Sequence, residues 1–401
     1  MLTQYFWPEN FVINDLTAGL VEKGHTVTVL TGIPNYPKGK FFSGYGIFKN
    51  LRQNYRGAEI IRVPLIPRGS GKKVCLFFNY LSFAFFASIL APFVCRQPYH
   101  AIFVYEPSPI TVGLPALVLK KIKSARLLFW VQDLWPESLS AGGAEPFSFI
   151  FKLVKKLVQF IYHRCDLILV QSKAFIPSVQ NFGVDIKRIF YFPNGAEEFY
   201  RPVELGADSE ERKVIPQGFV ILFAGNIGVS QDFGTIISAA EKLKEYKEIH
   251  WVIIGDGRMR SWVEEEIVKR NLGENILLLE RRPAELMPRY FALADALLVT
   301  LKKEEIFKLT IPSKIQAYLA CAKPIIVSLE GEGARIVEES GAGFSCPPEN
   351  SEALSQLVLR IYCMEPAERQ AMGLKGRRYF ESNFERKTLL NQVDSLIKTI
   401  K

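Results

Sequence analysis

Residues 310–324 read TIPSKIQAYLACAKP, and this stretch decides the fold. It predicts a helix that begins at Pro312 and is followed by the apolar strand Ile325-Ile326-Val327. Proline is favoured at the first helical position, where its missing N–H group would have no partner in any case. A helix followed closely by a buried strand is typical of a doubly wound α/β sheet, which presents helix N-termini to a ligand.

The rest of the chain repeats this alternation. Apolar strands are predicted at residues 26–31, 59–63, 101–105, 126–131, 167–170 and 189–192, and again at 219–223, 251–254, 276–279, 296–300 and 324–328. Because 401 residues are too many for one hydrophobic core, we expect two Rossmann-like domains of the α/β class.

The expected boundaries follow from composition. The polar stretch 197–217 has no periodic pattern and is the predicted linker between an N-terminal domain, 1–196, and a C-terminal domain, 218–383. Residues 384–401 are predicted to form a last helix. The strand at the N-terminus is only a few residues long, which favours a truncated start.

Composition excludes several classes of protein. The balance of 50 Lys and Arg against 41 Asp and Glu gives a net charge of +9, a mild excess that suits phosphate ligands or an anionic membrane surface. The six cysteines and four histidines show no metal-ligand spacing, so neither a metal nor a cofactor is expected. Since no recognition module is present, nucleic acid is not an expected partner.

The apolar run from Val74 to Cys95 leaves three interpretations: a transmembrane helix, a membrane-surface helix or a core helix. A single span conflicts with the strands predicted before and after it, which belong to one sheet. Lys72 and Lys73 precede the run, and the basic, apolar helix predicted at 147–164 resembles it in character. The pattern favours a cytoplasmic protein that docks peripherally on the inner face of the cell membrane.

The first half of the chain contains four short motifs in a characteristic order. They are PEN at 8–10, GHTVTVLTG at 24–32, PNYPKG at 34–39 and VQDLWPES at 131–138. Together with 312–318, they resemble the family 4 glycosyltransferases, and among these the colanic-acid and amino-fucose transferase group of bacterial surface-polysaccharide synthesis. The resemblance covers essentially the whole chain. It implies two Rossmann-like domains facing across a cleft, with the C-terminal helix crossing back to the first domain.

The resemblance also implies a reaction. A retaining transferase of this type moves a hexosyl or N-acetylhexosaminyl group from a nucleotide-diphosphate donor, with a UDP-sugar favoured, to a lipid-linked or polysaccharide-precursor acceptor. Catalysis then consists mostly of positioning and of stabilising the departing diphosphate. A non-catalytic relative that binds nucleotide sugar or scaffolds a complex is the alternative. A dehydrogenase is disfavoured because WPEN at 7–10 is not a GxGxxG loop.

The donor site is expected in the second half. Gly225, Asn226 and Gly228 lie between a buried strand and a helix, where glycines let the backbone approach a diphosphate. The resemblance often places a basic residue after the second glycine, where this chain has Val229. Positive charge is therefore expected from other residues, each of which is equally compatible with a plain surface charge: Arg258, Arg281, Lys308 and Lys314.

Family 4 enzymes commonly carry two glutamates separated by seven residues. Matching on 312–314 and Tyr318 places Leu309 and Ala317 at these positions. Their polar neighbours Lys308 and Gln316 keep the same spacing, and the Gln316 amide suits a ribose hydroxyl. The alternative, that both lie on a helix surface, remains open.

Asp133 follows a predicted strand at its C-terminal end. It is the candidate catalytic residue, which would orient the acceptor hydroxyl or hold a donor sugar hydroxyl; a cap of the following turn is the competing interpretation. Glu9, Asn10 and Tyr36 lie in neighbouring loops, where they either bind the acceptor or shape the loops.

Overall fold

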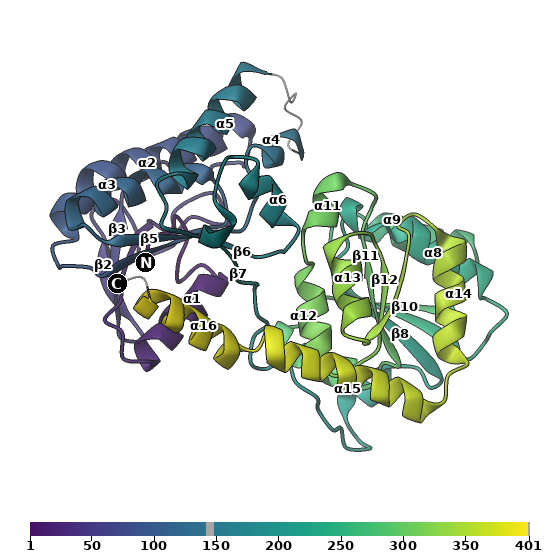
Figure 1. The fold of residues 1–401 in the computed structure, drawn as a ribbon. Helices are drawn as coiled ribbons and strands as arrows, with labels where there is room; N and C mark the ends of the chain where they lie inside the picture. The colour runs from purple at the N-terminus through teal and green to yellow at the C-terminus, as the bar shows by residue number, and fades with distance from the viewer. Residues whose placement is uncertain (142–147, 400–401) are drawn as a thin grey trace. The chain divides into compact units, whose positions relative to one another are not determined.

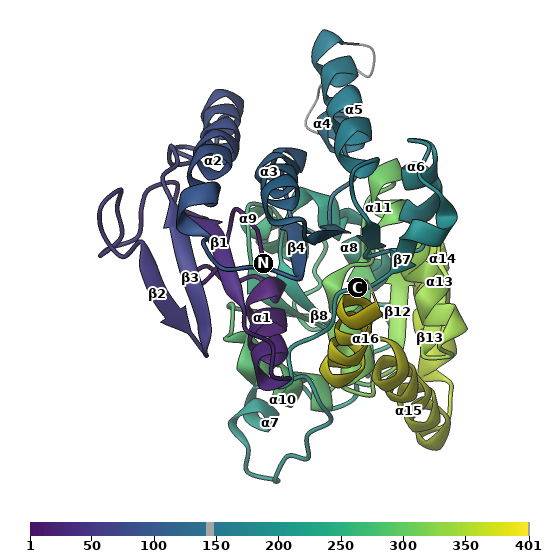
Figure 2. The same ribbon diagram turned by 60° about the vertical axis from the view of Figure 1, so that its left-hand side comes forward.

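The computed structural model describes residues 1–141 and 148–399. The chain divides into two compact units, one formed by Met1–Pro193 with Leu389–Lys401 and the other by Asn194–Thr388. Each unit is a mostly parallel sheet with helices on both faces (Figures 1 and 2). This is the doubly wound α/β architecture that the sequence predicts.

The sheet of unit 1 consists of two ladders, ordered β1-β3-β2 and β4-β5-β6-β7. Leu2 forms parallel bridges with both Leu30 of β1 and Val104 of β4, so the N-terminal residues occupy the position of a strand between the ladders. Among the described strands of this sheet, β2 alone runs antiparallel. The strands are β1 (Thr28–Gly32), β2 (Arg52–Tyr55), β3 (Ala58–Val63), β4 (Ala101–Glu106), β5 (Arg126–Val131), β6 (Leu167–Val170) and β7 (Ile189–Tyr191).

The helices of unit 1 cover both faces of this sheet (Figures 1 and 2). One face carries α2 (Lys73–Val94), α3 (Gly113–Lys123) and α5 (Phe149–Tyr162), and the other carries α1 (Val12–Glu22) and α16 (Arg386–Thr399). Two further helices are α4 (Glu137–Ala141) and α6 (Phe175–Gln180).

The last helix returns to unit 1, as the sequence predicts. Leu389, Leu390 and Val393 of α16 are buried in the same core cluster as α1. The His25 ring and the Asp394 carboxylate, with Nε2 and Oδ1 2.8 Å apart, add a polar contact at the edge of this core.

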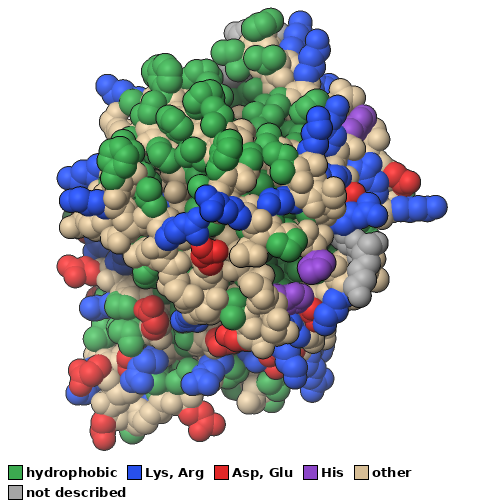
Figure 3. Space-filling model, turned by 90° about the vertical axis from the view of Figure 1, so that its left-hand side faces the viewer, with side chains coloured by type: hydrophobic (Ala, Val, Ile, Leu, Met, Phe, Trp, Pro, Cys, Tyr) green, Lys and Arg blue, Asp and Glu red, His purple; other side chains and the backbone are tan. Residues whose placement is uncertain are grey.

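Helix α2 exposes much of its apolar surface. It is long and apolar enough to cross a membrane by length and composition alone, and only 33% of its most apolar window is buried, so it is not an ordinary core helix. A single crossing is inconsistent with the fold, because β3 before it and β4 after it belong to the same unit. The outward side chains of α2 include Val74, Phe77, Phe78, Leu81, Phe85, Ile89 and Phe93, and those of α5 include Phe149, Ile150, Leu153 and Phe160. Figure 3 shows hydrophobic side chains gathered on this part of the molecule.

Unit 2 contains one six-stranded parallel sheet in the order β10-β9-β8-β11-β12-β13. Along β8, Val220 and Leu222 belong to the core on one face, whereas Ile221 and Phe223 belong to the core on the other. The strands are β8 (Phe219–Asn226), β9 (Ile249–Asp256), β10 (Ile276–Leu279), β11 (Ala296–Thr300), β12 (Ile325–Ser328) and β13 (Gly343–Cys346). The helices are α7 (Glu210–Val214), α8 (Phe233–Lys242), α9 (Arg260–Lys269), α10 (Met287–Ala292), α11 (Glu305–Leu309), α12 (Ser313–Ala320), α13 (Glu332–Glu339), α14 (Ser351–Tyr362) and α15 (Pro366–Asn383).

Two expectations need correction. The stretch 197–217 is not a free linker, since Ile215 lies in the core of unit 2 and the Glu211 carboxylate accepts hydrogen bonds from Arg289 at 2.6 and 2.8 Å. Helix α12 begins at Ser313, with Pro312 as its extended N-cap, one residue later than predicted. The carbonyl of Pro312 accepts from the N–H of Ile315 at 2.9 Å, which fixes this start.

Candidate functional site

Unit 2 contains a cavity of about 530 Å³ at the C-terminal ends of β8 and β9. Ligands of doubly wound folds bind at this edge of the sheet. The wall combines the end of β8, the start of α12, the segment before α10 and residues from 197–200. Its lining includes the cations Arg281, Arg282 and Lys314, the rings of Tyr200, Phe291 and Tyr318, and the acids Glu197 and Asp256.

The floor of this cavity requires glycine at two positions. Gly225 has φ +139°, and a Cβ there would lie 2.8 Å from Cε of Lys314. A Cβ on Gly255 of β9 would lie 1.9 Å from the carbonyl oxygen of Gly225, so the two strand ends approach too closely for any side chain. The Tyr318 hydroxyl accepts from the N–H of Ala224 at 3.2 Å, which ties α12 to the end of β8.

Lys314 is the basic side chain best placed for an anionic ligand. Its Nζ donates to Oε1 of Gln231 and lies 3.8 Å from the centroid of the Phe223 ring. Among the described residues it forms no ion pair, and burial lowers its pKa to about 7. The side chain is partly accessible to solvent but closely surrounded by protein atoms. An ammonium in such a site without a carboxylate partner gains from a ligand that brings negative charge.

The other predicted donor residues divide into two groups. Gly225, Asn226 and Arg281 line the cavity, as does Arg282 beside them. Gly228 is buried and Arg258 is exposed, and neither lines it. Lys308 lies outside it and forms ion pairs with Glu305 at 2.8 Å and Glu330 at 3.2 Å.

Gln316 and Ala317 differ in what they face. Gln316 is buried, does not line the cavity, and donates through Nε2 to the carbonyl of Asn194 at 3.3 Å. Ala317 lines the cavity, in agreement with the alignment anchored on Tyr318. The carboxylate of Glu197 also lines it. Sequence reasoning missed Glu197 because it lies in the polar stretch interpreted as a linker.

Glu9 organises the loops at the C-terminal edge of the sheet in unit 1. It is 3% exposed, and its carboxylate accepts from the N–H groups of Asn35 and Tyr36, both at 2.7 Å, and of Phe6 at 3.2 Å. Burial raises the pKa of Glu9 to about 7, although these three bonds act in the opposite direction. Both carboxylate oxygens of Glu9 therefore bind backbone N–H groups of the loops, and the side chain is almost fully shielded from solvent.

The loops that Glu9 joins present an aromatic platform. The rings of Tyr5, Phe11 and Tyr36 lie 5.4 to 5.7 Å from one another, and the Arg68 guanidinium lies 5.0 Å from the Tyr36 ring. Asn10, which directly precedes Phe11 in the sequence, is exposed. Tyr5 is buried, and Tyr36 is the exposed ring of the three. An exposed ring with a neighbouring cation suits a ligand that carries both sugar and phosphate.

Asp133 lies just beyond the C-terminal end of β5. It is partly buried, and burial raises its pKa to about 6. Sequence reasoning missed Glu106, the last residue of β4, which is fully buried and whose pKa the charge of Asp133 helps to raise. The available signal was an acidic residue at the end of the apolar run Ala101–Tyr105.

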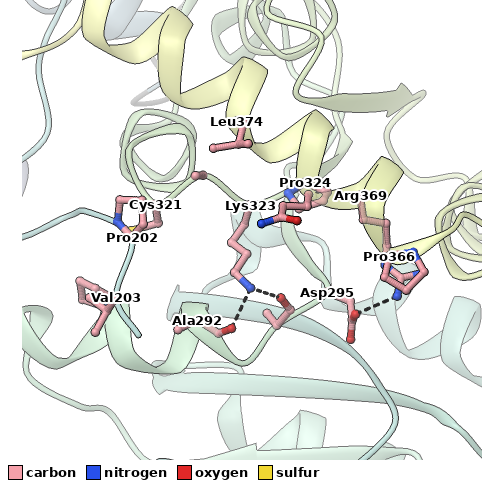
Figure 4. A pocket seen from close by; sticks show the side chains of 14 residues that line it. Pro202, Val203, Ala292, Asp295, Cys321, Lys323, Pro324, Pro366, Arg369 and Leu374 are labelled. Carbon is pink, nitrogen blue, oxygen red and sulfur yellow. Dashed lines mark hydrogen bonds and ion pairs between the residues drawn. The ribbon is translucent and has the colours of Figure 1, made fainter. Parts of the chain in front are cut away.

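A second cavity in unit 2, of about 410 Å³, lies where β11 and β12 begin (Figure 4). Lys323 points into it and donates to the carbonyls of Ala292 at 2.7 Å and Ala294 at 2.8 Å. Arg369 pairs with Asp295 at 3.3 Å. Since these cations are held by the protein itself, this cavity is a weaker candidate than the one around Lys314.

Known proteins resemble the chain along both units. The family model "Glycosyl transferase 4-like domain" matches residues 10–195, and "Glycosyl transferases group 1" matches residues 207–379. The chain is 30% identical to "Probable glycosyltransferase WbjE" of Pseudomonas aeruginosa over 262 residues, which are 62% of this chain and 64% of that protein, less than two thirds of its length. It is 23% identical to "Putative colanic acid biosynthesis glycosyl transferase WcaI" of Escherichia coli (strain K12) over 96% of both chains.

A solved structure shares the fold. Anabaena HepE in complex with UDP superposes with a TM-score of 0.71 at 16% identity, covering 99% of this chain and 98% of that one.

We predict that Lys314→Ala weakens the binding of a nucleoside diphosphate, with UDP as the probe, by about 1.5 to 3 kcal/mol, because a hydrogen bond to a charged group is lost, while the fold is retained. Isothermal titration calorimetry measures the change. Lys308→Ala is the matched control, since this lysine lies outside the cavity and should leave UDP affinity unchanged. An equal loss in both variants would contradict the assignment of Lys314.

We also predict a pH dependence. With a pKa of about 7 in the free protein, Lys314 loses its charge as pH rises, so UDP affinity should fall between pH 7.5 and 9.5 by up to about tenfold per pH unit. The nucleotide's terminal phosphate is already ionised over this range. Lys314→Arg should bind UDP with little pH dependence, and an identical slope in that variant would assign the titration to another group.

Proposed function

Because the chain belongs to the glycosyltransferases of the family 4, two-Rossmann-domain type, we propose that it transfers a sugar with retention of configuration from a UDP-sugar to a lipid-linked or polysaccharide-precursor acceptor in cell-surface polysaccharide synthesis. The observation that carries the proposal is the donor-type cavity of unit 2, with the uncompensated ammonium of Lys314 beside a glycine floor. The named relatives and the UDP complex of a similar fold support the class of donor and product.

The residues of the cavity suit the parts of such a donor. The diphosphate would lie over Gly225 and Asn226, with positive charge from Lys314 and Arg281. The rings of Tyr200 and Phe291, with centroids 6.2 Å apart and an interplanar angle of 12°, provide apolar surface for the base. Glu197 is the carboxylate available to the ribose hydroxyls, since α12 contributes Ala317 there.

Asp133 is the proposed catalytic residue. An ionised carboxylate at the C-terminal edge of unit 1 would orient the acceptor hydroxyl or a hydroxyl of the donor sugar. The diphosphate leaving group itself can accept the acceptor proton, so the proposal requires no separate base. A hexosyl or an N-acetylhexosaminyl donor is compatible with these groups.

The acceptor would be held in unit 1. Tyr36, Asn10 and Arg68 present ring, amide and guanidinium groups at one edge of the sheet, which suit a saccharide joined to a phosphate. In this proposal Glu9 contributes by fixing the backbone of Asn35 and Tyr36.

The proposed location is the cytoplasmic face of the membrane. Helices α2, α3 and α5 cover one face of unit 1 and contain no Asp or Glu among them. Exposed lysines surround the exposed apolar side chains of α2 and α5. They are Lys72, Lys73, Lys152, Lys155 and Lys156. Apolar surface rimmed by cations suits an anionic leaflet.

The second candidate is a non-catalytic relative that binds nucleotide sugar or scaffolds a complex. It draws on Val229, Leu309 and Ala317, where the family pattern leads one to expect charged residues. Release of UDP from UDP-sugars by the purified full-length protein, with and without a lipid-diphosphate acceptor, tests the choice. No turnover of any donor would favour the scaffold.

We predict that Asp133→Asn lowers transfer roughly a hundredfold and leaves UDP affinity nearly intact, because a group acting mainly in the transition state affects turnover more than donor binding. Single-turnover transfer and calorimetry measure the two effects. A folded variant with the wild-type rate would leave Asp133 as a cap of the turn after β5.

For the membrane, we predict that Lys72→Gln with Lys73→Gln weakens binding to phosphatidylglycerol vesicles by about 2 kcal/mol, roughly thirtyfold, at about 1 kcal/mol per lysine. Vesicle co-sedimentation measures it. Lys244→Gln with Lys247→Gln, which removes the same charge from the surface of unit 2, is the control. Equal losses in both double variants, or equal binding to anionic and neutral vesicles, or no binding to either, would argue against electrostatic docking through Lys72 and Lys73.

A further inference from the structure

Glu106 and Asp133 lie at the C-terminal edge of the same parallel sheet. Strand β4 ends at Glu106, which is opposite Val131, the last residue of β5 and two residues before Asp133. The N–H of Gln132 donates to the carbonyl of Glu106 at 3.2 Å, so the backbone holds the two strand ends together.

The carboxyl group of Glu106 is enclosed. The residue is 0% exposed, neither side-chain oxygen has a hydrogen-bond partner of good geometry, and among the described residues it forms no ion pair. The N–H groups of Asp133 and Gln132 and the Trp135 indole lie near it and lower its pKa. Burial first, and then the charge on Asp133, outweigh them and raise the pKa well above its usual range. Ionisation there would leave a buried charge without a counterion.

In the part of the chain that the structure describes, the other titratable groups around Glu106 offer no counterion. Tyr105 on β4 and Tyr162 on α5 are kept neutral by burial, which raises the pKa of each phenol. The Tyr162 hydroxyl, Oε2 of Glu137 on α4 and Nε1 of Trp135 are also buried without hydrogen-bond partners. The charge that acts most strongly on Glu106 is Asp133, which has the same sign.

We propose that Glu106 is a positioning residue of the transferase site, which as a neutral carboxylic acid supports the strand end that carries Asp133 and keeps the single negative charge of the pair on Asp133. This rests on the proposed function. Two neighbouring carboxyl groups in one buried site do not both ionise readily, and Asp133, which is less buried, is the one that ionises first.

The protonation of Glu106 is tested without any substrate. Urea denaturation of the full-length protein and of Glu106→Gln is compared from pH 5 to 9. Both proteins carry Trp251→Phe and Trp262→Phe, so that the remaining tryptophan fluorescence comes from Trp7, Trp130 and Trp135 of unit 1. A carboxyl group with a raised native pKa stabilises the fold fully below its unfolded pKa of about 4.5, and this stability is lost as pH rises toward the native value.

The unfolding constant of the wild type should therefore rise relative to that of Glu106→Gln by up to about tenfold per pH unit over this window. Glu9 and Asp133 also titrate there, but they are present in both proteins and cancel in the comparison. Parallel curves for the two proteins would overturn the proposal.

The role toward Asp133 is tested by the pH profile of kcat/KM for sugar transfer. The acidic limb of the wild type should lie near pH 6, the pKa of Asp133. Glu106→Ala should lower kcat/KM about tenfold or more and move the limb toward pH 4, because water then reaches Asp133. Glu106→Gln, which keeps the shape and neutrality of the acid, should restore the wild-type limb.

Two outcomes of the transfer assay would overturn the proposal. A roughly hundredfold loss in Glu106→Gln would mean that Glu106 acts through its charge, and a wild-type rate and limb in Glu106→Ala would mean that it positions nothing; either overturns the proposal. If Glu106→Ala fails to fold, the limb of Glu106→Gln and the denaturation comparison decide. If instead Asp133→Asn transfers at the wild-type rate, the proposed function of Asp133 fails while the denaturation result still decides the state of Glu106.

Discussion

The backbone of Leu2 holds the sheet of unit 1 together. Its N–H donates to the carbonyl of Phe103 at 2.8 Å, and its carbonyl accepts from the N–H of Tyr105 at 3.0 Å. On the other side, Met1 and Thr3 bond to Leu30 at 2.9 and 3.1 Å. The ladders containing β1 and β4 meet along this short segment. The loops joined by Glu9 and the strand ends that carry Glu106 and Asp133 all depend on that connection, because a parallel sheet brings functional groups together only when its strands are in register.

The sequence predicted the central strands well because they are buried on both faces and are therefore apolar along their whole length. The bounds of the inner strands β5, β6 and β11 agree with prediction to the residue. Those of β10 agree as well, because this edge strand reads Ile-Leu-Leu-Leu and is apolar throughout. Two edge strands were missed. Strand β2 reads Arg-Gln-Asn-Tyr, with alternating exposure and no apolar run, and β13 contains only four residues that include Gly343 and Ser345. Pairing to a neighbour, which no local pattern reveals, makes both of them strands.

The candidate site was predictable where glycine and proline mark the backbone conformation directly in the sequence. Gly225 and Lys314 could be found because a glycine after a strand and a helix start after proline both indicate a ligand edge. The register of α12 was harder, since one residue decides whether Gln316 or Ala317 faces the cavity. The ion pair of Lys308 with Glu330 and the enclosure of Glu106 depend on residues distant in sequence, and tertiary packing determines them.

The acid-free face of unit 1 has a geometric consequence. Helices α2 and α3 pack on one face of the sheet and α5 packs against α3, so contact through this face would bring the strands roughly parallel to the plane of the bilayer. The C-terminal edge of the sheet, with Asp133 and the platform around Tyr36, would then face sideways at the height of the lipid head groups. An acceptor anchored in the leaflet would reach this edge by lateral diffusion, in a two-dimensional search that requires no extraction of its lipid from the bilayer.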